Sequence, residues 1–274
     1  MDLFVTDLDG TLLNSDIMVS GKSTEIINKL IKEGMQFTVA TARTPATAVD
    51  LLENLNITLP VVLMNGVLVY DLKKKEYIDI KEINKSIMEK VLIEVENSNK
   101  SPLIYGIKDD HLWVYHKEFS GPVEEKFYKD RVDKPLKTFV KVEDYREAIR
   151  NSDIINIVSF DTYEKISQLG EALNKIEGLT VNTYEDVYDR GTYFLEAYST
   201  EASKANGIKF LANYVSHEKL VCFGDNLNDI PMFELADESY ATANAADKLK
   251  ELATDVIGSC NEDGVAEFLD KYSK

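Results

Sequence analysis

Two carboxylates stand two residues apart at the end of a short apolar run near the start of the sequence. The run Leu3–Thr6 predicts a buried strand, and Asp7 and Asp9 follow it, with Gly10 allowing a tight turn. Side chains two apart on an extended chain point to one face, so both carboxylates could meet the same ligand. Two adjacent carboxylates repel each other, which favours a hard cation such as Mg²⁺ between them. An acidic turn without a ligand is the alternative that this motif alone leaves open.

A second acidic motif follows another apolar run, Leu220–Phe223, in the last quarter of the sequence. Asp225 and Asp229 are four residues apart, which puts them on one side of a first helical turn. The helix dipole by itself favours acidic residues there, and that is the alternative explanation. Two acidic motifs at the ends of two predicted strands indicate one carboxylate cluster, which would be costly without a metal ion.

Groups suited to an anion occur at two further places. Thr41 and Arg43 follow a second apolar run, Phe37–Ala40, and provide a hydroxyl and a fork-shaped guanidinium that fits phosphate. Lys204 begins a predicted helix just before the strand that leads to Asp225. A lysine in such a place is usually solvated surface, and only the company of the other motifs makes it a candidate. Together these residues indicate an anionic substrate beside a cation.

The predicted helices and strands that position these motifs follow two different patterns along the sequence. Short apolar runs alternate with helix-period segments over residues 1–82 and 189–274, which predicts one α/β domain with a doubly wound, mostly parallel sheet. Residues 83–188 contain a helix, a hairpin at 103–107 and 112–115, and further strands and helices. We therefore expect an α+β domain inserted into the α/β domain.

Composition excludes several classes of function. The 274 residues include 31 Lys and Arg against 48 Asp and Glu, a net charge of −17, and no segment is basic. A general nucleic-acid binder or a protein that binds anionic membranes would need the opposite balance. No apolar stretch reaches the roughly 20 residues that span a bilayer. The two cysteines, Cys222 and Cys260, cannot form a disulfide framework, and the first residues do not look like a signal peptide, so we expect a cytoplasmic protein.

The ordered set of motifs resembles the haloacid dehalogenase superfamily, and more narrowly its Cof-type subfamily IIB phosphatases. The resemblance rests on Asp7-x-Asp9-Gly10-Thr11, Thr41, Lys204, Gly224-Asp225-x-x-Asn228-Asp229, Asn65-Gly66 and the segment 261–266. The sequence departs from the subfamily in having Ala42, Ala205 and Ala243 where glycine is usual. None of these changes removes a catalytic group, although Ala243 adjoins Asn244 and bears on the geometry of that loop.

The resemblance implies a Mg²⁺-dependent phosphatase that hydrolyses a small phosphorylated metabolite, a sugar phosphate or a phosphorylated cofactor. Asp7 would be the nucleophile that forms an aspartyl-phosphate, and Asp9 the general acid and base. Thr41 and Lys204 would hold the phosphoryl oxygens. Residues 83–188 would be a cap domain of type C2.

The resemblance also implies which residues bind the metal and the substrate. Mg²⁺ would be held by Asp7, the backbone carbonyl of Asp9, and Asp225, with Asp229 behind them. The substrate would be bound by Arg43, Asn65, Gly66 and Asn228. We expect a monomer or a weak homodimer that binds neither nucleic acid nor membranes.

Two alternatives remain open at this point. A phosphomutase or phosphotransferase would use the same aspartyl-phosphate but pass it to a second hydroxyl. A non-catalytic sensor of phosphorylated metabolites would keep the pocket, but it would have no need of the general acid Asp9.

Overall fold

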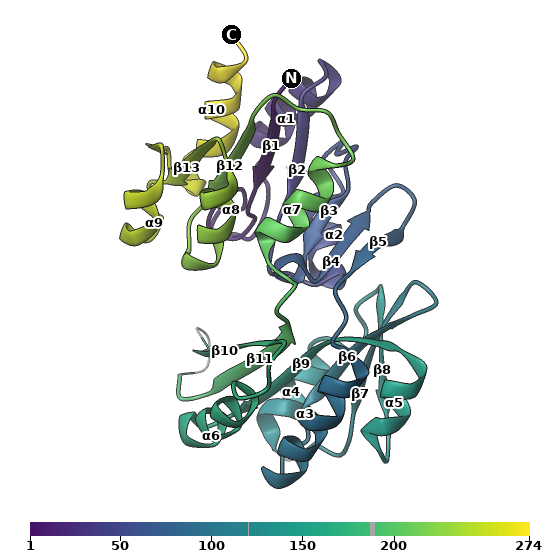
Figure 1. Ribbon diagram of the computed structural model, residues 1–274. Helices are drawn as coiled ribbons and strands as arrows, with labels where there is room; N and C mark the ends of the chain where they lie inside the picture. The colour runs from purple at the N-terminus through teal and green to yellow at the C-terminus, as the bar shows by residue number, and fades with distance from the viewer. Residues whose placement is uncertain (120, 187–189) are drawn as a thin grey trace. The chain divides into compact units, whose positions relative to one another are not determined.

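Both ends of the chain fold into one unit, and the middle of the chain forms a second. The computed structural model describes residues 1–119, 121–186 and 190–274. The core unit comprises Met1–Asp79 and Ala202–Lys274, and the inserted unit comprises Ile80–Glu201 (Figure 1). The N- and C-termini lie together in the core unit, where Tyr272 Oη donates a hydrogen bond to Asp2 at 2.9 Å.

The main sheet of the core unit is parallel throughout. Its strand order is β14-β13-β12-β1-β2, and the bounds are β1 (Leu3–Thr6), β2 (Gln36–Val39), β12 (Leu220–Gly224), β13 (Glu238–Thr242) and β14 (Asp255–Ile257). In β1, Thr6 pairs with Val39 on one side and with Phe223 on the other. The carboxyl ends of β1, β2 and β12 therefore meet at one edge, where open α/β sheets bind ligands.

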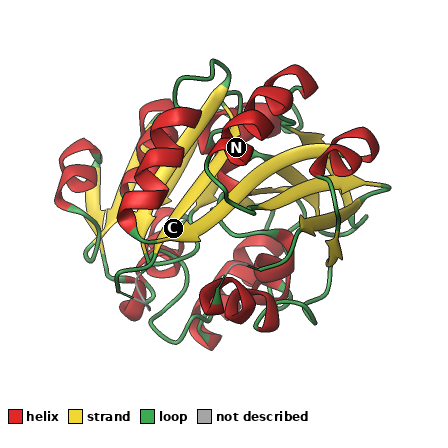
Figure 2. Cartoon of the chain, turned by 90° about the horizontal axis from the view of Figure 1, so that it is seen from below, coloured by secondary structure: helices red, strands yellow, loops and turns green. Residues whose placement is uncertain are grey.

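Helices pack on both faces of this sheet and confirm the predicted α/β fold class. They are α1 (Gly21–Lys32), α2 (Pro45–Leu52), α7 (Lys204–Ala212), α8 (Ile230–Leu235), α9 (Asp247–Leu252) and α10 (Gly264–Tyr272), with 3-10 turns at Met64–Gly66, Leu227–Asp229 and Cys260–Glu262. Leu3 of β1 packs with Ile208 of α7, whereas Phe4, which points the other way, meets Tyr272 of α10. Helices alternate with the strands of the main sheet along the chain. Figure 2 shows helices in red and strands in yellow.

A small antiparallel sheet extends the core unit beyond β2. It consists of β3 (Val61–Leu63), β4 (Leu68–Asp71) and β5 (Glu76–Ile80), in the order β3-β4-β5. A single parallel bridge between Ala40 and Val62 joins β3 to the end of β2. The turn between β3 and β4 contains Asn65 and Gly66 and is therefore held next to the residues that follow β2.

The inserted unit has one mixed sheet with three helices on one face. Its strands are β6 (Leu103–Lys108), β7 (His111–His116), β8 (Lys137–Lys141), β9 (Asp153–Asp161), β10 (Leu179–Glu185) and β11 (Tyr193–Ser199), and its helices are α3 (Lys85–Asn97), α4 (Pro122–Lys129), α5 (Tyr145–Asn151) and α6 (Tyr163–Leu173). The order is β10-β11-β9-β6-β7-β8, antiparallel except for β7 and β8. The predicted α+β architecture and the β6–β7 hairpin are confirmed.

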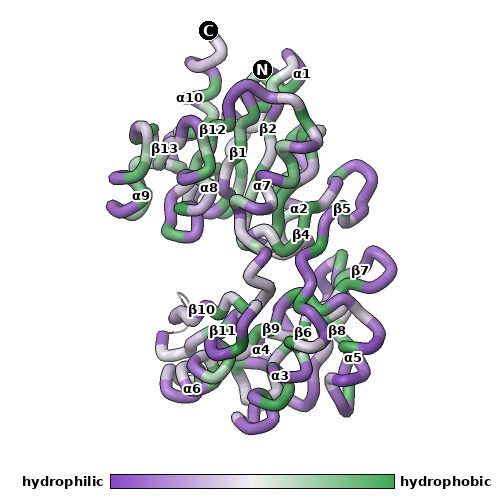
Figure 3. Tube along the Cα trace, in the orientation of Figure 1, coloured by the Kyte–Doolittle hydropathy of each residue, from purple (hydrophilic) through white to green (hydrophobic). Residues whose placement is uncertain are grey.

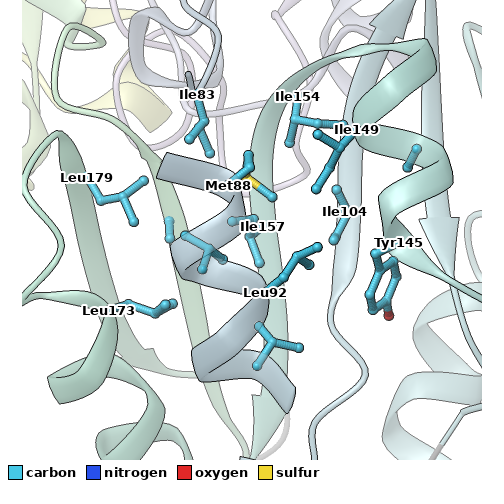
Figure 4. Packing of buried hydrophobic residues seen from close by; sticks show 14 of the residues in the cluster. Ile83, Met88, Leu92, Ile104, Tyr145, Ile149, Ile154, Ile157, Leu173 and Leu179 are labelled. Carbon is cyan, nitrogen blue, oxygen red and sulfur yellow. The ribbon is translucent and has the colours of Figure 1, made fainter. Parts of the chain in front are cut away.

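Branched aliphatic side chains form the core of the inserted unit between its sheet and α3, α5 and α6. Figure 4 shows Leu92 of α3 beside Ile104 and Ile157 of the sheet, all of them buried. Figure 3 shows that hydrophobic residues concentrate along the central strands of each unit and that hydrophilic residues concentrate on the loops. Among the described residues, no helix is long and apolar enough to cross a membrane.

The boundaries of the inserted unit differ from those expected from the sequence. The first lies between Asp79 and Ile80, three residues before the expected one. The second, expected between residues 188 and 189, falls outside the described residues. Strand β11 pairs with β9 and β10 along most of its length, so it belongs to the inserted unit and the core unit resumes at Ala202. Sequence periodicity does not say which sheet a lone strand joins, and this is why the boundary was misplaced.

Gly66 permits a close approach of two backbones that fixes the start of α7. Its φ is +89°, and a Cβ atom built there would lie 2.0 Å from the carbonyl oxygen of Ser203. Ser203 is the N-cap of α7, where its side chain accepts a hydrogen bond from the backbone N–H of Asn206. Any larger residue at position 66 must therefore displace the helix that begins with Lys204.

The variant Gly66→Ala tests this packing against Gly34→Ala in the same unit. Gly34 also has a positive φ, +106°, but a Cβ there would meet only the Met1 methyl at 3.8 Å. Backbone strain alone should cost Gly34→Ala about 1 kcal/mol of unfolding free energy, and overpacking should cost Gly66→Ala a further 1–3 kcal/mol, roughly. Urea unfolding followed by circular dichroism measures both. Equal losses would show that the contact with Ser203 is not tight.

Candidate active site

A buried lysine lies at the centre of the carboxyl-end edge of the core sheet. Lys204, the first residue of α7, is 1% exposed, and its Nζ donates to Asp7 Oδ1 at 2.6 Å and to Asp229 Oδ1 at 2.5 Å. Burial lowers the pKa of Lys204, but Asp7 and Asp229 outweigh it, so that the pKa ends above its ordinary value. A cation at a helix N-terminus opposes the helix dipole. The two carboxylates are therefore what hold the ammonium group there.

Three aspartates converge on this lysine from the ends of β1 and β12. One carboxylate oxygen from each of Asp7, Asp225 and Asp229 lies within 4.8 Å of the others. The pKa of Asp7 is raised to about 7, because burial raises it more than Lys204 lowers it and the nearby Asp229 adds to the rise. Burial and Asp229 likewise raise the pKa of Asp225 to about 6. The carboxylates repel each other, and one lysine does not balance them.

Both carboxylate oxygens of Asp229 accept hydrogen bonds that hold its side chain in place. Its Oδ2 accepts hydrogen bonds from the backbone N–H groups of Asp225 and Asn226, at 2.9 and 3.0 Å, while Oδ1 binds Lys204. Asn226 and Asp229 form a reciprocal capping box around the turn Leu227–Asp229. This arrangement fixes Asp229 behind the cluster and leaves Asp225 more exposed to a ligand.

The loop after β1 passes close to Asp225. Gly10 has φ +71°, and a Cβ there would lie 2.2 Å from Asp225 Oδ2. Thr11 Oγ1 donates to Asp225 Oδ1 at 3.3 Å. The Gly10 carbonyl accepts from Asn244 Nδ2 at 2.7 Å, and Asn244 Oδ1 accepts from the backbone of Cys260. The side chain of Asn244 thus connects the loop after β1 to the turn Cys260–Glu262 that precedes α10. It does so although Ala243 replaces the glycine that is usual beside it.

Asp9 and Arg43 form a pair that the sequence reasoning missed. Arg43 Nη2 donates to Asp9 Oδ1 at 2.6 Å, and Arg43 Nε donates to Oδ2 at 2.7 Å. The Asp9 carboxylate therefore lies outside the group formed by Asp7, Asp225 and Asp229. The two residues are 34 positions apart, and they meet because β1 and β2 are parallel neighbours. Only the order of strands in the sheet, which the sequence does not state, would have revealed the contact.

The remaining predicted residues lie on the side of β2 and β3. Thr41 is fully buried, and its Oγ1 accepts from the backbone N–H of Arg43 at 3.2 Å. Asn65, at φ +54°, receives a hydrogen bond from Asn228 Nδ2 at 3.3 Å. Gly66 contacts the backbone before Lys204. The structure thus brings all these residues to the same edge of the core unit, while their roles stay predictions.

Comparison with known proteins shows the family. The family described as haloacid dehalogenase-like hydrolase matches residues 4–269. The chain belongs to the haloacid dehalogenase-like hydrolase family.

Several members of this family match the chain over nearly its whole length. The 5-amino-6-(5-phospho-D-ribitylamino)uracil phosphatase YitU of Bacillus subtilis is 25% identical and covers 98% of this chain and 97% of its own. The crystal structure of TM0651 from Thermotoga maritima is 25% identical, with a TM-score of 0.79 over 98% of this chain and 96% of its own. These comparisons confirm the predicted family and its enzyme class, the phosphatases.

A relative with another name is similar over only part of its length. The chloroplastic endoribonuclease YBEY of Arabidopsis thaliana is 29% identical over 97% of this chain, but the chain spans only 46% of that protein.

The subclass IIB sugar phosphatase BT4131 has the same fold, with a TM-score of 0.74 at 21% identity over 100% of this chain and 99% of its own.

The chemistry of the cluster fits a divalent cation. Three carboxylates and one ammonium leave a formal charge of −2 in a largely buried place. Carboxylate oxygens are the ligands that Mg²⁺ prefers, and Mg²⁺ commonly takes one or two of them and keeps several waters. The raised pKa values of Asp7 and Asp225 express the same imbalance, which a dication would remove.

Affinity for Mg²⁺ should fall as the pH is lowered. A carboxyl group with a raised pKa takes up a proton near neutral pH, and the proton competes with the cation. From about pH 8 to about pH 6, protonation of a group with the pKa of Asp7 would weaken binding about tenfold. Titration calorimetry in two buffers of different ionisation enthalpy measures the affinity and the protons released. An affinity that does not change with pH, with no proton release, would contradict the titration of this cluster.

Proposed function

We propose that the chain hydrolyses a small phosphomonoester through an aspartyl-phosphate on Asp7, with Mg²⁺ as its cofactor. The observation that carries this proposal is the buried Lys204 ammonium held between Asp7 and Asp229 at the carboxyl end of β1. A protein that only binds a phosphorylated molecule would gain little from a buried carboxylate that a lysine holds in one orientation. A nucleophile that must meet a phosphate needs this arrangement, because the lysine orients one oxygen and leaves the other to react.

In the first step a carboxylate oxygen of Asp7 attacks phosphorus. The new O–P bond forms while the bond between phosphorus and the leaving oxygen breaks. The bond from Lys204 fixes Asp7 Oδ1, and this positive charge lies beside the phosphoryl oxygens as their charge develops. Thr41 supplies a hydroxyl on the β2 side. Bound Mg²⁺ would reduce the repulsion between the anionic nucleophile and the anionic phosphate.

Asp9 would transfer protons in both steps, first to the oxygen of the leaving alcohol and then from the attacking water. Once Arg43 has released it, Asp9 takes a proton from solvent and gives it to the leaving alkoxide, and the resulting carboxylate then takes a proton from water. That water attacks phosphorus and releases phosphate and free Asp7. Because both Asp9 oxygens are bonded to Arg43, the pair must open before this can happen. An anionic substrate can open it, since a phosphate competes with Asp9 for the guanidinium.

The residues that would hold cation and substrate follow from the same arrangement. Asp7, Asp225 and the backbone carbonyl of Asp9 would hold Mg²⁺, with Asp229 orienting them from behind. Arg43, Asn65, Gly66 and Asn228 would line the substrate side. The nearby Asn65–Asn228 hydrogen bond supports a shared position for the two amides.

The substrate that fits best is a small phosphorylated metabolite, either a sugar phosphate or a phosphorylated cofactor. The relatives YitU and YwtE of Bacillus subtilis are both named 5-amino-6-(5-phospho-D-ribitylamino)uracil phosphatase, and that name describes a small phosphorylated molecule. The net charge of −17 opposes the approach of a phosphorylated polymer, whereas a small molecule meets only the local cations.

The variant Asp7→Asn should abolish turnover of p-nitrophenyl phosphate. Its amide is a poor nucleophile, so kcat should fall at least about a thousandfold. The matched control is Asp16→Asn in the exposed loop after the same strand, which should keep the rate of the original chain. Release of p-nitrophenol measures both. Residual activity of Asp7→Asn within tenfold of the control would rule out Asp7 as the nucleophile.

A further inference from the structure

A cavity of about 870 Å³ opens in the core unit between α1, α2 and the turn that follows β4. The residues that line it come from the segments 28–32, 49–58 and 72–73. It lies at the amino-terminal edge of the core sheet, because α1 ends at Lys32 just before β2 begins, and α2 leads back from the carboxyl end of β2. The cavity is therefore separate from the candidate active site, which lies at the opposite edge of the same sheet.

Hydrogen bonds of Asn28 hold two walls of the cavity together. Its Nδ2 donates to the Asn54 carbonyl at 2.8 Å, and its Oδ1 accepts from the backbone N–H of Asn56 at 2.7 Å. Both polar ends of this side chain are thus used within the protein, where they join α1 to the loop after α2. A cavity with walls fixed in this way is formed before a ligand arrives, which lowers the entropic cost of binding.

The floor of the cavity is apolar and its opening is charged. Leu52, Leu55 and Ile57 are buried, whereas Lys32 and Lys73 are exposed. Sites for small molecules commonly combine an apolar lining with a few charged or polar groups. This arrangement fits a molecule that has an apolar body and one charged end.

Positive charge prevails at the opening, although the protein as a whole is acidic. Three lysines and one acidic residue, Glu53, are among the described residues that line the cavity, a formal charge of +2 against −17 for the whole chain. The side chains of Lys32 and Lys73 make no ion pair with any described residue, whereas the adjacent Lys74 pairs with two acidic residues. The opening therefore complements an anion.

The lysine that carries most of this charge argument is Lys73. Lys29 and Lys32 have a second explanation, since basic residues are favoured in the last turn of a helix. The charge of Lys29 is also partly offset, because the pKa of Asp270 is lowered by its hydrogen bond from Lys274 and also by Lys29. Neither explanation applies to Lys73, which follows a strand of the small sheet.

We propose that this cavity binds a small carboxylate with an apolar body, of the size of a medium-chain fatty acid. The apolar body packs on Leu52, Leu55 and Ile57, and the carboxylate lies at the opening beside Lys32 and Lys73. A carboxylate is favoured over a phosphate, because no arginine is among the described lining residues and the fork of a guanidinium matches phosphate best. The proposal does not depend on the phosphatase reaction.

Titration of the full ¹⁵N-labelled chain with octanoate at constant ionic strength tests the site. Backbone signals of residues 28–32, 49–58 and 72–73 should shift and saturate, while the signals of the residues that follow β1 and β12 stay in place. Octanol, which has the same tail without the charge, should shift the same signals with weaker affinity. Shifts that do not saturate, or that occur only after β1 and β12, would overturn the site.

The variant Lys73→Met should weaken octanoate binding about threefold, as the loss of one exposed ion pair does, and should leave octanol binding unchanged. The matched control is Lys75→Met, which removes the same charge from the same turn but outside the lining of the cavity. It should leave the binding of both compounds unchanged. Equal weakening of octanoate in the two variants, or no weakening in Lys73→Met, would contradict a preference for an anion at this opening.

The variant Val49→Trp should abolish saturable binding of both compounds, because Val49 lines the cavity from α2 and the larger ring fills it. Unchanged binding in a variant whose spectrum shows the folded chain would place octanoate elsewhere. If a second copy of the chain covers the cavity instead, the same signals should shift with protein concentration in the absence of octanoate. That result would assign the cavity to self-association and overturn the proposal.

Discussion

The site depends on one ammonium group buried among carboxylates. Lys204 binds Asp7 and Asp229 at hydrogen-bond distance, although burial and the helix dipole both oppose a cation at that place. Removing either partner would leave an uncompensated charge. The fold brings the three together by parallel pairing of β1 with β12 and by the contact between Gly66 and Ser203, which sets where α7 begins. The strand pairing and the Gly66–Ser203 contact thus determine the position of the Asp7 carboxylate.

The same electrostatic balance explains how an acidic protein can handle phosphate. The cluster is locally negative, so that a divalent cation bound there would offset its charge toward an anionic substrate. Arg43 is the nearby cation on the substrate side, and the structure shows it neutralised by Asp9. In the mechanism that we propose, substrate and Asp9 would share this guanidinium, so that the arrival of phosphate would release Asp9.

The sequence predicted what depends on local chemistry and missed what depends on strand order. Asp7 and Asp225 could be found because each follows an apolar run with a recognisable spacing, whereas Lys204, which begins a predicted helix, became a candidate only through its company with the other motifs. The Asp9–Arg43 pair could not, because it requires β1 and β2 to be neighbours. The membership of β11 in the inserted sheet is likewise a matter of long-range pairing. The α/β and α+β fold classes were predictable, since periodicity reports them directly.

The most direct test of the account is the mass of the acid-quenched enzyme during turnover. Asp9→Asn should slow hydrolysis of the intermediate, because no base remains to activate water, and the phosphorylated chain should accumulate. With p-nitrophenyl phosphate and Mg²⁺ present, the N-terminal tryptic peptide, which contains Asp7, should gain the mass of one phosphoryl group, and fragmentation should assign it to Asp7. Turnover with no phosphorylated peptide, or phosphorylation at another residue, would contradict the account.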